Sequence, residues 1–148
     1  MALDTWNNID NFKIESEEYY CAFVDILGYK NKSDEFFSEK YNLHGRYERA
    51  LNDSMQLMKS TELFSLGLVD SKLLQIKFFS DSIIVTHPKN RNARDAIYLV
   101  LMFCRILSAH LSFEGLFVRG GVSFGGHVEK ENKENQYSFL SSKALEKA

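Results

Sequence analysis

The sequence is poor in residues that cross-link, interrupt or strongly charge a chain. Its 148 residues include two cysteines and one proline, and the formal net charge is -2. Cys21 and Cys104 both lie in apolar runs, which indicates free thiols in a reducing compartment rather than a disulfide. The near-neutral charge argues against a general nucleic-acid binder, which usually has a strong basic excess or stripe. A nucleotide site needs only local charge and stays open.

Long apolar runs, low-complexity tracts and interdomain linkers are also absent. The longest apolar stretch, 96–107, is broken by Arg105 and is too short to span a bilayer. The polar, acidic N-terminus does not have the pattern of a signal peptide. We therefore expect a cytoplasmic protein with no membrane partner and no nucleic-acid partner. The 45% hydrophobic content suits one globular domain over 19–148, with residues 1–18 as an N-terminal arm.

The apolar patterns predict the element order β-α-α-β-β-α-β. Aromatic and β-branched runs predict strands, and steps of three to four residues predict helices. This order is typical of an α+β domain of the ferredoxin-like or palm type, an antiparallel sheet with helices packed on one face. The expected elements are a strand over 19–27, helical structure over 33–66 divided at Gly45, a turn at Asp70-Ser71, strands over 73–79 and 83–87 with Pro88 as the end, a helix over 93–113 capped by Asn90 or Asn92, a strand over 116–128, a charged loop over 129–136, a strand over 137–140, and a helix starting at 141–142.

Two of the predicted strands each carry one aspartate, Asp25 in the run 20–29 and Asp81 in the run 76–85. A buried carboxylate is costly unless its charge is compensated. In the predicted topology the first strand and the central hairpin lie side by side, so both aspartates converge at one edge of the sheet. A shared pair of divalent cations suited to phosphoryl or nucleotidyl transfer is the resulting hypothesis.

The segment that follows Asp25 fits a phosphate-binding turn. Gly28 permits a sharp turn into a helix, whose backbone N–H groups can hold phosphate oxygens, and Lys30 adds positive charge. The alternative is that Asp25 caps this helix and that Asp81 lies in the hairpin turn because aspartate favours turns.

Other polar and glycine patterns carry weaker signals. The histidines lack metal-ligand spacing and are expected at surfaces or edges; they are His44, His87, His110 and His127. The pairs Gly120-Gly121 and Gly125-Gly126 are expected to mark strand bends or close backbone packing.

Taken together, these motifs resemble the catalytic domain of class III nucleotidyl cyclases, and more closely the short bacterial pyrimidine cyclases of anti-phage cyclic-nucleotide (Pycsar) systems. The resemblance covers residues 19–148 and rests on Asp25-Ile26-Leu27-Gly28-Tyr29, on Ser80-Asp81 where the family has glycine-aspartate, and on the small-residue stretch 118–125.

The resemblance implies a role for each matched position. Asp25 and Asp81 would be the catalytic metal ligands for two Mg²⁺ or Mn²⁺ ions per site, joined by the carbonyl of Ile26. Lys77 lies where adenylyl cyclases of this class place a base-selecting lysine, and Arg119 would reach a phosphate or carboxylate across a dimer interface. The alternatives are a solvent-facing strand residue for Lys77 and a structural ion pair for Arg119. The implied substrate-binding residues are Ile26, Leu27, Gly28, Tyr29, Lys77 and Arg119.

Several positions depart from the family pattern. Ser142 stands at a glycine position and Glu146 at an asparagine position, and the transition-state arginine would come just beyond Ala148. Either the C-terminal part of the domain is truncated, or the protein solves this problem differently, or it does not catalyse. Phe139 stands where adenylyl cyclases have a base-contacting aspartate, so the base stays open between purine and pyrimidine.

The leading hypothesis from the sequence is a nucleotidyl cyclase that converts a nucleoside triphosphate (NTP) to a 3′,5′-cyclic nucleotide and pyrophosphate in a head-to-tail homodimer. A role in anti-phage signalling follows from the resemblance alone. The alternative is a catalytically silent, cyclase-like module for nucleotide binding or dimerisation. A polymerase-type palm lacks the basic surface expected for a template strand.

Overall fold

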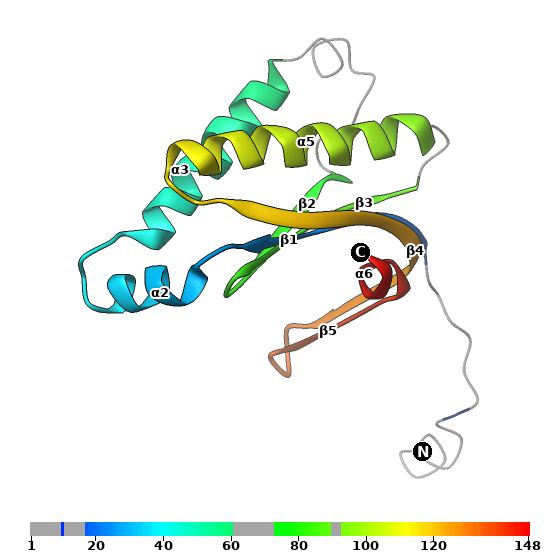
Figure 1. The fold of residues 1–148 in the computed structure, drawn as a ribbon. Coiled ribbons are helices and arrows are strands. Elements are labelled where there is room, and N and C mark those ends of the chain that lie inside the picture. Colours follow the sequence, from blue (N-terminus) through cyan, green and yellow to red (C-terminus); the bar gives the residue numbers. More distant parts are fainter. Residues whose placement is uncertain (1–9, 11–16, 61–72, 90–92) are drawn as a thin grey trace.

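The computed structural model describes residues 10, 17–60, 73–89 and 93–148 (Figure 1). The elements along the chain are β1 (Glu17–Ile26), α2 (Tyr29–Phe37), α3 (Leu43–Lys59), β2 (Gln75–Phe79), β3 (Ser82–Pro88), α5 (Ala93–Phe113), β4 (Val118–Asn132), β5 (Tyr137–Ser142) and α6 (Lys143–Lys147). The predicted turn at Asp70-Ser71, the caps Asn90 and Asn92, and the helical residues 61–66 lie outside the described residues.

The five described strands form one antiparallel sheet in the order β2-β3-β1-β4-β5. The helices α3 and α5 cover one face of it, and the short α6 lies on the other face beside β4 (Figure 1). The predicted α+β architecture is therefore confirmed, with α3 and α5 as the helices that share a face. Because side chains alternate along a strand, every second residue of β1 and β3 faces these helices.

The core lies between the sheet and the two long helices. On β1, Ala22, Val24 and Ile26 face it, and α5 contributes a broad apolar side because its buried residues recur at helical spacing. Burial of these side chains provides most of the stabilisation of the fold. The fully buried α5 residues among those described are Ala96, Leu99, Val100, Phe103, Leu107 and Leu111.

The same helix is long and apolar enough, by length and composition, to cross a membrane. The window Ala96–Phe113 has a mean hydropathy of 1.7 over 18 residues. The sequence estimate from 96–107 missed this because it ended the stretch too early. One side of this helix packs against β1 and β3, and 33% of the window is buried inside the structure.

The helical region before β2 is divided earlier than predicted. The break falls at residues 38–42, and Gly45 lies in the first turn of α3, where its N–H donates to the Asn42 side chain at 2.9 Å. Asn42 is thus the N-cap, and it satisfies a backbone donor that helical geometry leaves without a partner. The predicted division at Gly45 is wrong because this cap, and not the glycine, sets the start of the helix.

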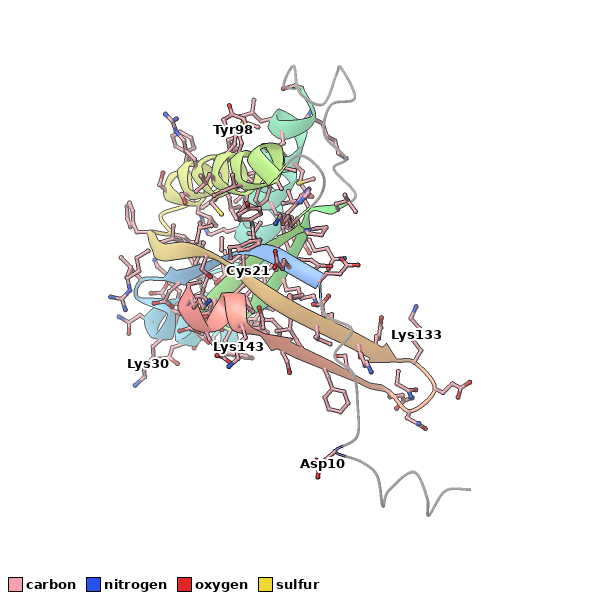
Figure 2. The ribbon with its side chains drawn as sticks, turned by 90° about the vertical axis from the view of Figure 1, so that its right-hand side faces the viewer. Asp10, Cys21, Lys30, Tyr98, Lys133 and Lys143 are labelled. Atoms are coloured by element: carbon pink, nitrogen blue, oxygen red, sulfur yellow. The ribbon has the colours of Figure 1, made fainter. Side chains whose placement is uncertain are left out.

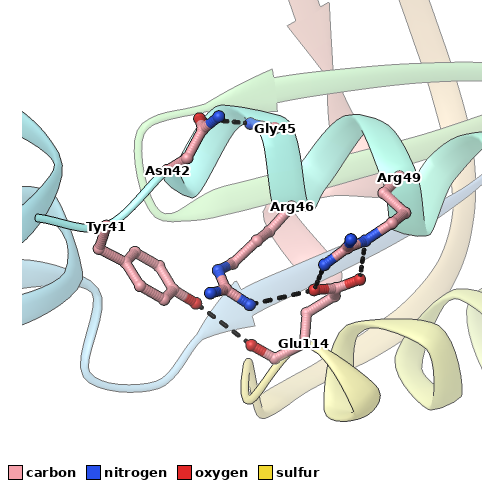
Figure 3. A network of polar contacts seen from close by, with 6 residues as sticks. All are labelled: Tyr41, Asn42, Gly45, Arg46, Arg49 and Glu114. Atoms are coloured by element: carbon pink, nitrogen blue, oxygen red, sulfur yellow. Dashed lines mark hydrogen bonds and ion pairs between the residues drawn. The ribbon is translucent and has the colours of Figure 1, made fainter. Parts of the chain in front are cut away.

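Glu114, in the loop between α5 and β4, connects this loop to α3 and to the segment before it through polar contacts (Figure 3). Its carboxylate accepts from Arg46 at 3.2 Å and also from Arg49, and its carbonyl accepts from the Tyr41 hydroxyl at 3.2 Å. The hydrogen bond from Arg49, with the charge of Arg46, holds the pKa of Glu114 below its ordinary value. The network joins this loop to α3 and to Tyr41, in the segment between α2 and α3.

The predicted charged loop 129–136 is wrong in its first half. β4 continues to Asn132, and only 133–136 form the turn into β5, as the hairpin in Figure 2 shows, with Lys133 at its end. Within β4, Glu129 and Glu131 face one side and Lys130 the other. Charged residues occur in this strand because it extends beyond the helices and both faces remain accessible.

Close approach of α6 explains part of the glycine pattern in β4. A Cβ on Gly125 would lie 3.0 Å from the Ala144 backbone nitrogen, and one on Gly120 would lie 2.1 Å from the Phe23 carbonyl oxygen. The prediction of close backbone packing is confirmed at these positions. Cys21, labelled in Figure 2, is buried under α6, where its thiol lies 3.9 Å from the Ser142 hydroxyl.

Two expectations about side chains also have clear outcomes. Both cysteines are free, as predicted, and burial raises the pKa of Cys104 to about 11. The expectation of surface or edge histidines is wrong for His87 and His127, which are buried within the sheet. His87 is on β3 and His127 is on β4, and the alternation of side chains along each strand places both imidazoles on covered parts of the sheet. The sequence pattern showed this alternation only weakly.

Candidate functional site

Asp25 and the turn that carries Asp81 lie at the same end of two neighbouring strands. Asp25 pairs with Ser82 in the register of β1 and β3, and the N–H of Ile26 donates to the carbonyl of Asp81 at 2.8 Å. This main-chain bond brings together two segments that are distant in the sequence. Within the hairpin, β3 pairs with β1 from Tyr19 to Asp25, and β2 pairs with the other side of β3.

The Asp25 side chain belongs to the sheet face that α3 and α5 leave uncovered, since its neighbours Val24 and Ile26 are in the core. It is 25% exposed, and Asp81 is exposed in the turn. Both acids reach water, so neither carries the full desolvation cost of a charge in the interior.

The turn after β1 has the geometry of a tight connection. Gly28 adopts φ 69° at the N-cap of α2, and no side chain caps this helix. The alternative that Asp25 caps α2 is thus not observed. The N–H of Leu27 donates to the Phe117 carbonyl at 2.8 Å, which ties the turn to the residue before β4. Tyr29 begins α2 itself.

The turn between β2 and β3 contains a residue other than glycine with a positive φ angle. Ser80 has φ 48°, a conformation that glycine adopts freely and that other residues seldom adopt. The serine thus occupies a glycine-like conformation immediately before Asp81. The predicted two-residue connection between the strands is confirmed.

Arg119 contacts Asp25 directly. Its Nε lies 3.4 Å from Oδ2 of Asp25, and the two residues are partners in the β1–β4 register. The Arg119 side chain is 75% exposed, so the contact is mostly solvated and weak. Its guanidinium remains accessible on the uncovered face, next to the Asp25 carboxylate.

Lys77 lies on the same face, on β2, and donates to the Glu129 carboxylate of β4, although β3 and β1 lie between these two strands. A pocket of about 570 Å³ opens between β2 and the β4–β5 hairpin at this pair. Exposed Phe79 and Phe139 also line it. Sequence reasoning missed Glu129 because it was assigned to a loop, and the alternation of charge along 129–132 was the signal for a strand.

A second hollow lies on the helical side of the same end, with a volume of about 470 Å³. It is lined by Tyr29, Tyr47, Phe78 and Ser80 among others, and the Tyr47 and Phe78 rings stack at 5.2 Å. Burial, followed by the charges of Tyr29 and Asp81, raises the pKa of Tyr47. The electrostatic influence of Asp81 therefore extends into the helical layer.

The described residues contain no group of three or more histidine, cysteine or acidic side chains that could hold a metal ion. Asp25 and Asp81 place two carboxylates near the Ile26 carbonyl, at the strand end joined by the Ile26–Asp81 main-chain bond. Oxygen donors of this kind suit Mg²⁺ or Mn²⁺, and Mg²⁺ commonly takes one or two carboxylates and completes its shell with water or phosphate. The ligand types at this strand end therefore match those that such an ion prefers.

Comparison with known proteins shows which solved structures have a similar fold. No family model and no curated protein matches the sequence. Among solved structures, the chain is similar to the adenylyl cyclase CyaB from P. aeruginosa, with a TM-score of 0.62 at 15% identity over 93% of this chain and 71% of that one. The guanylyl cyclase Cya2 is matched with a TM-score of 0.48 at 14% identity over 89% of this chain and 67% of that one. The likeness to CyaB shows a class III cyclase-like fold.

Proposed function

We propose that this domain is a nucleotidyl cyclase that converts an NTP to a 3′,5′-cyclic nucleotide and pyrophosphate. The observation that carries the proposal is the bond from Ile26 N–H to the Asp81 carbonyl, which holds two accessible acids at one edge of a cyclase-like fold. The proposed site lies on the sheet face opposite α3 and α5, because Val24 and Ile26 on either side of Asp25 are in the core.

In this proposal Asp25 and Asp81, with the Ile26 carbonyl, hold Mg²⁺ or Mn²⁺. The cations, when bound, would acidify the attacking 3′-hydroxyl and neutralise charge on the triphosphate. The N–H groups of Ile26 and Leu27 are bonded to main-chain carbonyls, so Gly28 and Tyr29 contribute the backbone N–H groups at the start of α2, where anions are favoured. Arg119 adds a mobile positive charge beside Asp25, able to bind phosphate oxygens.

The pocket between β2 and the β4–β5 hairpin is the proposed place of the base. Lys77 offers a donor and Glu129 an acceptor, and the exposed rings of Phe79 and Phe139 offer flat apolar surfaces. Donors and acceptors in one pocket can distinguish the hydrogen-bonding edges of bases. A base that fails to match them leaves polar groups of the pocket without hydrogen bonds, and this costs binding free energy. This composition does not by itself choose between purine and pyrimidine.

The test uses the purified chain with each of the four NTPs and Mn²⁺ or Mg²⁺, and detects cyclic products by chromatography and mass spectrometry. Asp25→Asn and Asp81→Asn are expected to lower turnover at least a hundredfold while far-UV circular dichroism stays unchanged. Asp53→Asn, an exposed aspartate on α3, is the matched control and should keep full activity. Full activity in either site variant would refute the metal assignment.

One observation favours the alternative of a catalytically silent, nucleotide-binding or dimerisation module. The Asp25 carboxylate faces Arg119, so a cation there would compete with an ion pair. Binding of NTP without any cyclic product, with affinity unaffected by chelation of divalent cations, would support this alternative.

We also propose a homodimer in which the partner covers the sheet face opposite α3 and α5. Phe79 is 53% exposed on this face and lines the pocket beside Lys77. Large exposed apolar side chains near a site suit a protein interface. Light scattering coupled to size-exclusion chromatography should give a dimer for the wild type and a monomer for Phe79→Asp.

Anti-phage signalling in the cytoplasm is a further part of the proposal and rests on the sequence resemblance to the Pycsar cyclases. Plaque counts on cells that express the full system, with wild type or Asp81→Asn, test it. Equal protection by both forms would refute a signalling role that depends on cyclase activity.

A further inference from the structure

One carboxylate oxygen is shared by two possible cationic partners. Oε1 of Glu129 accepts from Nζ of Lys77 and also lies 3.9 Å from Nε2 of His127. Lys77 comes from β2 at the edge of the sheet, whereas Glu129 and His127 are on β4. The curvature of the sheet allows this contact across β3 and β1.

His127 is held in place and cannot easily turn to another partner. It is 4% exposed, its ring lies 4.5 Å from that of Tyr19, and its Nδ1 lies 4.0 Å from the Cys21 sulfur. Its Nε2 is buried and has no hydrogen-bond partner among the described residues. A buried polar atom without a partner is costly, so a proton on Nε2 would draw the Glu129 carboxylate toward it.

We propose that Glu129 is a positioning residue for Lys77 and that protonation of His127 weakens this hold. The inference rests on the proposed function, in which Lys77 reads the base of the NTP. When His127 is neutral with its proton on Nδ1, Glu129 binds Lys77 alone and fixes its ammonium in the pocket. With imidazolium, the same oxygen is shared, and Lys77 becomes mobile. Base recognition then weakens, while binding of the triphosphate at the other end of the site does not change.

The ionisable groups around His127 determine where this change occurs. From β1, Glu17, Tyr19 and Cys21 face it; from β4, Glu129 and Glu131; and from β2, Lys77. The charged side chains Lys143 and Glu146 of α6 pair with each other at the surface. Burial, followed by the charge of Lys77, lowers the pKa of His127, so the proton is taken up below the ordinary value of 6.5.

The experiment compares two ligands in the presence of Mg²⁺. One is the most tightly bound of the four NTPs, as a non-cyclisable 3′-deoxy analogue, and the other is ribose 5-triphosphate, which lacks a base. The ratio of their dissociation constants measures base recognition, and it is followed from about pH 5.5 to pH 8, the range over which an imidazole titrates. The proteins are the full chain and its variants Glu129→Gln, Lys77→Met and the double variant. The matched control is Glu134→Gln, in the exposed hairpin turn.

In the wild type, the preference for the base should fall at low pH. Glu129→Gln should lower it about tenfold at pH 8 and remove its pH dependence, because a charge-assisted hydrogen bond is lost. Ribose triphosphate should bind equally to all proteins, and Glu134→Gln should match the wild type. In the Lys77→Met background, Glu129→Gln should have no further effect.

Two results would overturn the inference: a Glu129→Gln variant with the preference and pH profile of the wild type, or an undiminished effect of Glu129→Gln in the Lys77→Met background. A wild type that binds NTP no more tightly than ribose triphosphate would instead refute the base pocket of the proposed function, and the inference with it.

Discussion

Replacement of Gly120 by alanine should destabilise the domain severely, because its backbone meets that of β1 directly. A Cβ at this position would lie 2.1 Å from the Phe23 carbonyl oxygen, more than 1 Å short of ordinary contact at 3.4 Å. Phe23 is in the central strand and cannot move without disturbing pairing on both sides. Overpacking of this kind typically costs 1–3 kcal/mol, and we expect about 3 kcal/mol here because backbone rather than a side chain must shift.

The neighbouring Gly121 is the matched control for this prediction. Its Cβ would lie 3.2 Å from the carbonyl carbon of Ala148, so a small local shift relieves the contact. Urea unfolding followed by far-UV circular dichroism gives both free energies of unfolding. For a domain of this size, about 3 kcal/mol corresponds to a fall in Tm of roughly 10 °C. If Gly120→Ala were no less stable than Gly121→Ala, the close approach of β4 and β1 would be refuted.

Three further outcomes follow from single positions. Phe103→Ala removes a fully buried ring from α5 and should cost about 3–5 kcal/mol in chemical denaturation, with Leu101→Ala, exposed on the same helix, as a control that costs far less. Ser80→Gly should raise the free energy of unfolding by up to about 1 kcal/mol, because the φ of 48° suits glycine; a loss of stability would contradict this. The lowered pKa of His127 means that the unfolded state binds more protons just below pH 6.5, so stability should decline as pH falls through this window. His127→Phe should flatten the decline, whereas His44→Gln, at an exposed position, should retain it.

The sequence predicted most of the fold because its strands and helices have strong local signals. The hairpin at Ser80-Asp81 and the end of β3 at Pro88 are confirmed, and so is the helix over 93–113. The extension of β4 through Glu129 was missed, since a charged run resembles a loop when nothing local shows that a partner strand is present. The break before α3 was misplaced because Asn42 acts through a side-chain cap.

The candidate site was predictable in part. The sequence placed Asp25 and Asp81 at adjacent strand ends, and the register of β1 and β3 agrees. Their metal-binding role stays a prediction. The contacts of Lys77 with Glu129 and of Arg119 with Asp25 depend on sheet curvature and strand order, which no single stretch of sequence contains.

The hydrogen bond from Ile26 to Asp81 makes the site sensitive to how the strands align during folding. If β1 paired with β3 one residue out of step, every side chain of β1 would change faces, and Asp25 would point into the apolar layer under α5. Such a misaligned chain would have to bury an acid and expose Val24 and Ile26. The acidic residue that we assign to chemistry therefore also penalises the nearest competing alignment, so its replacement by asparagine should make misfolded species easier to populate.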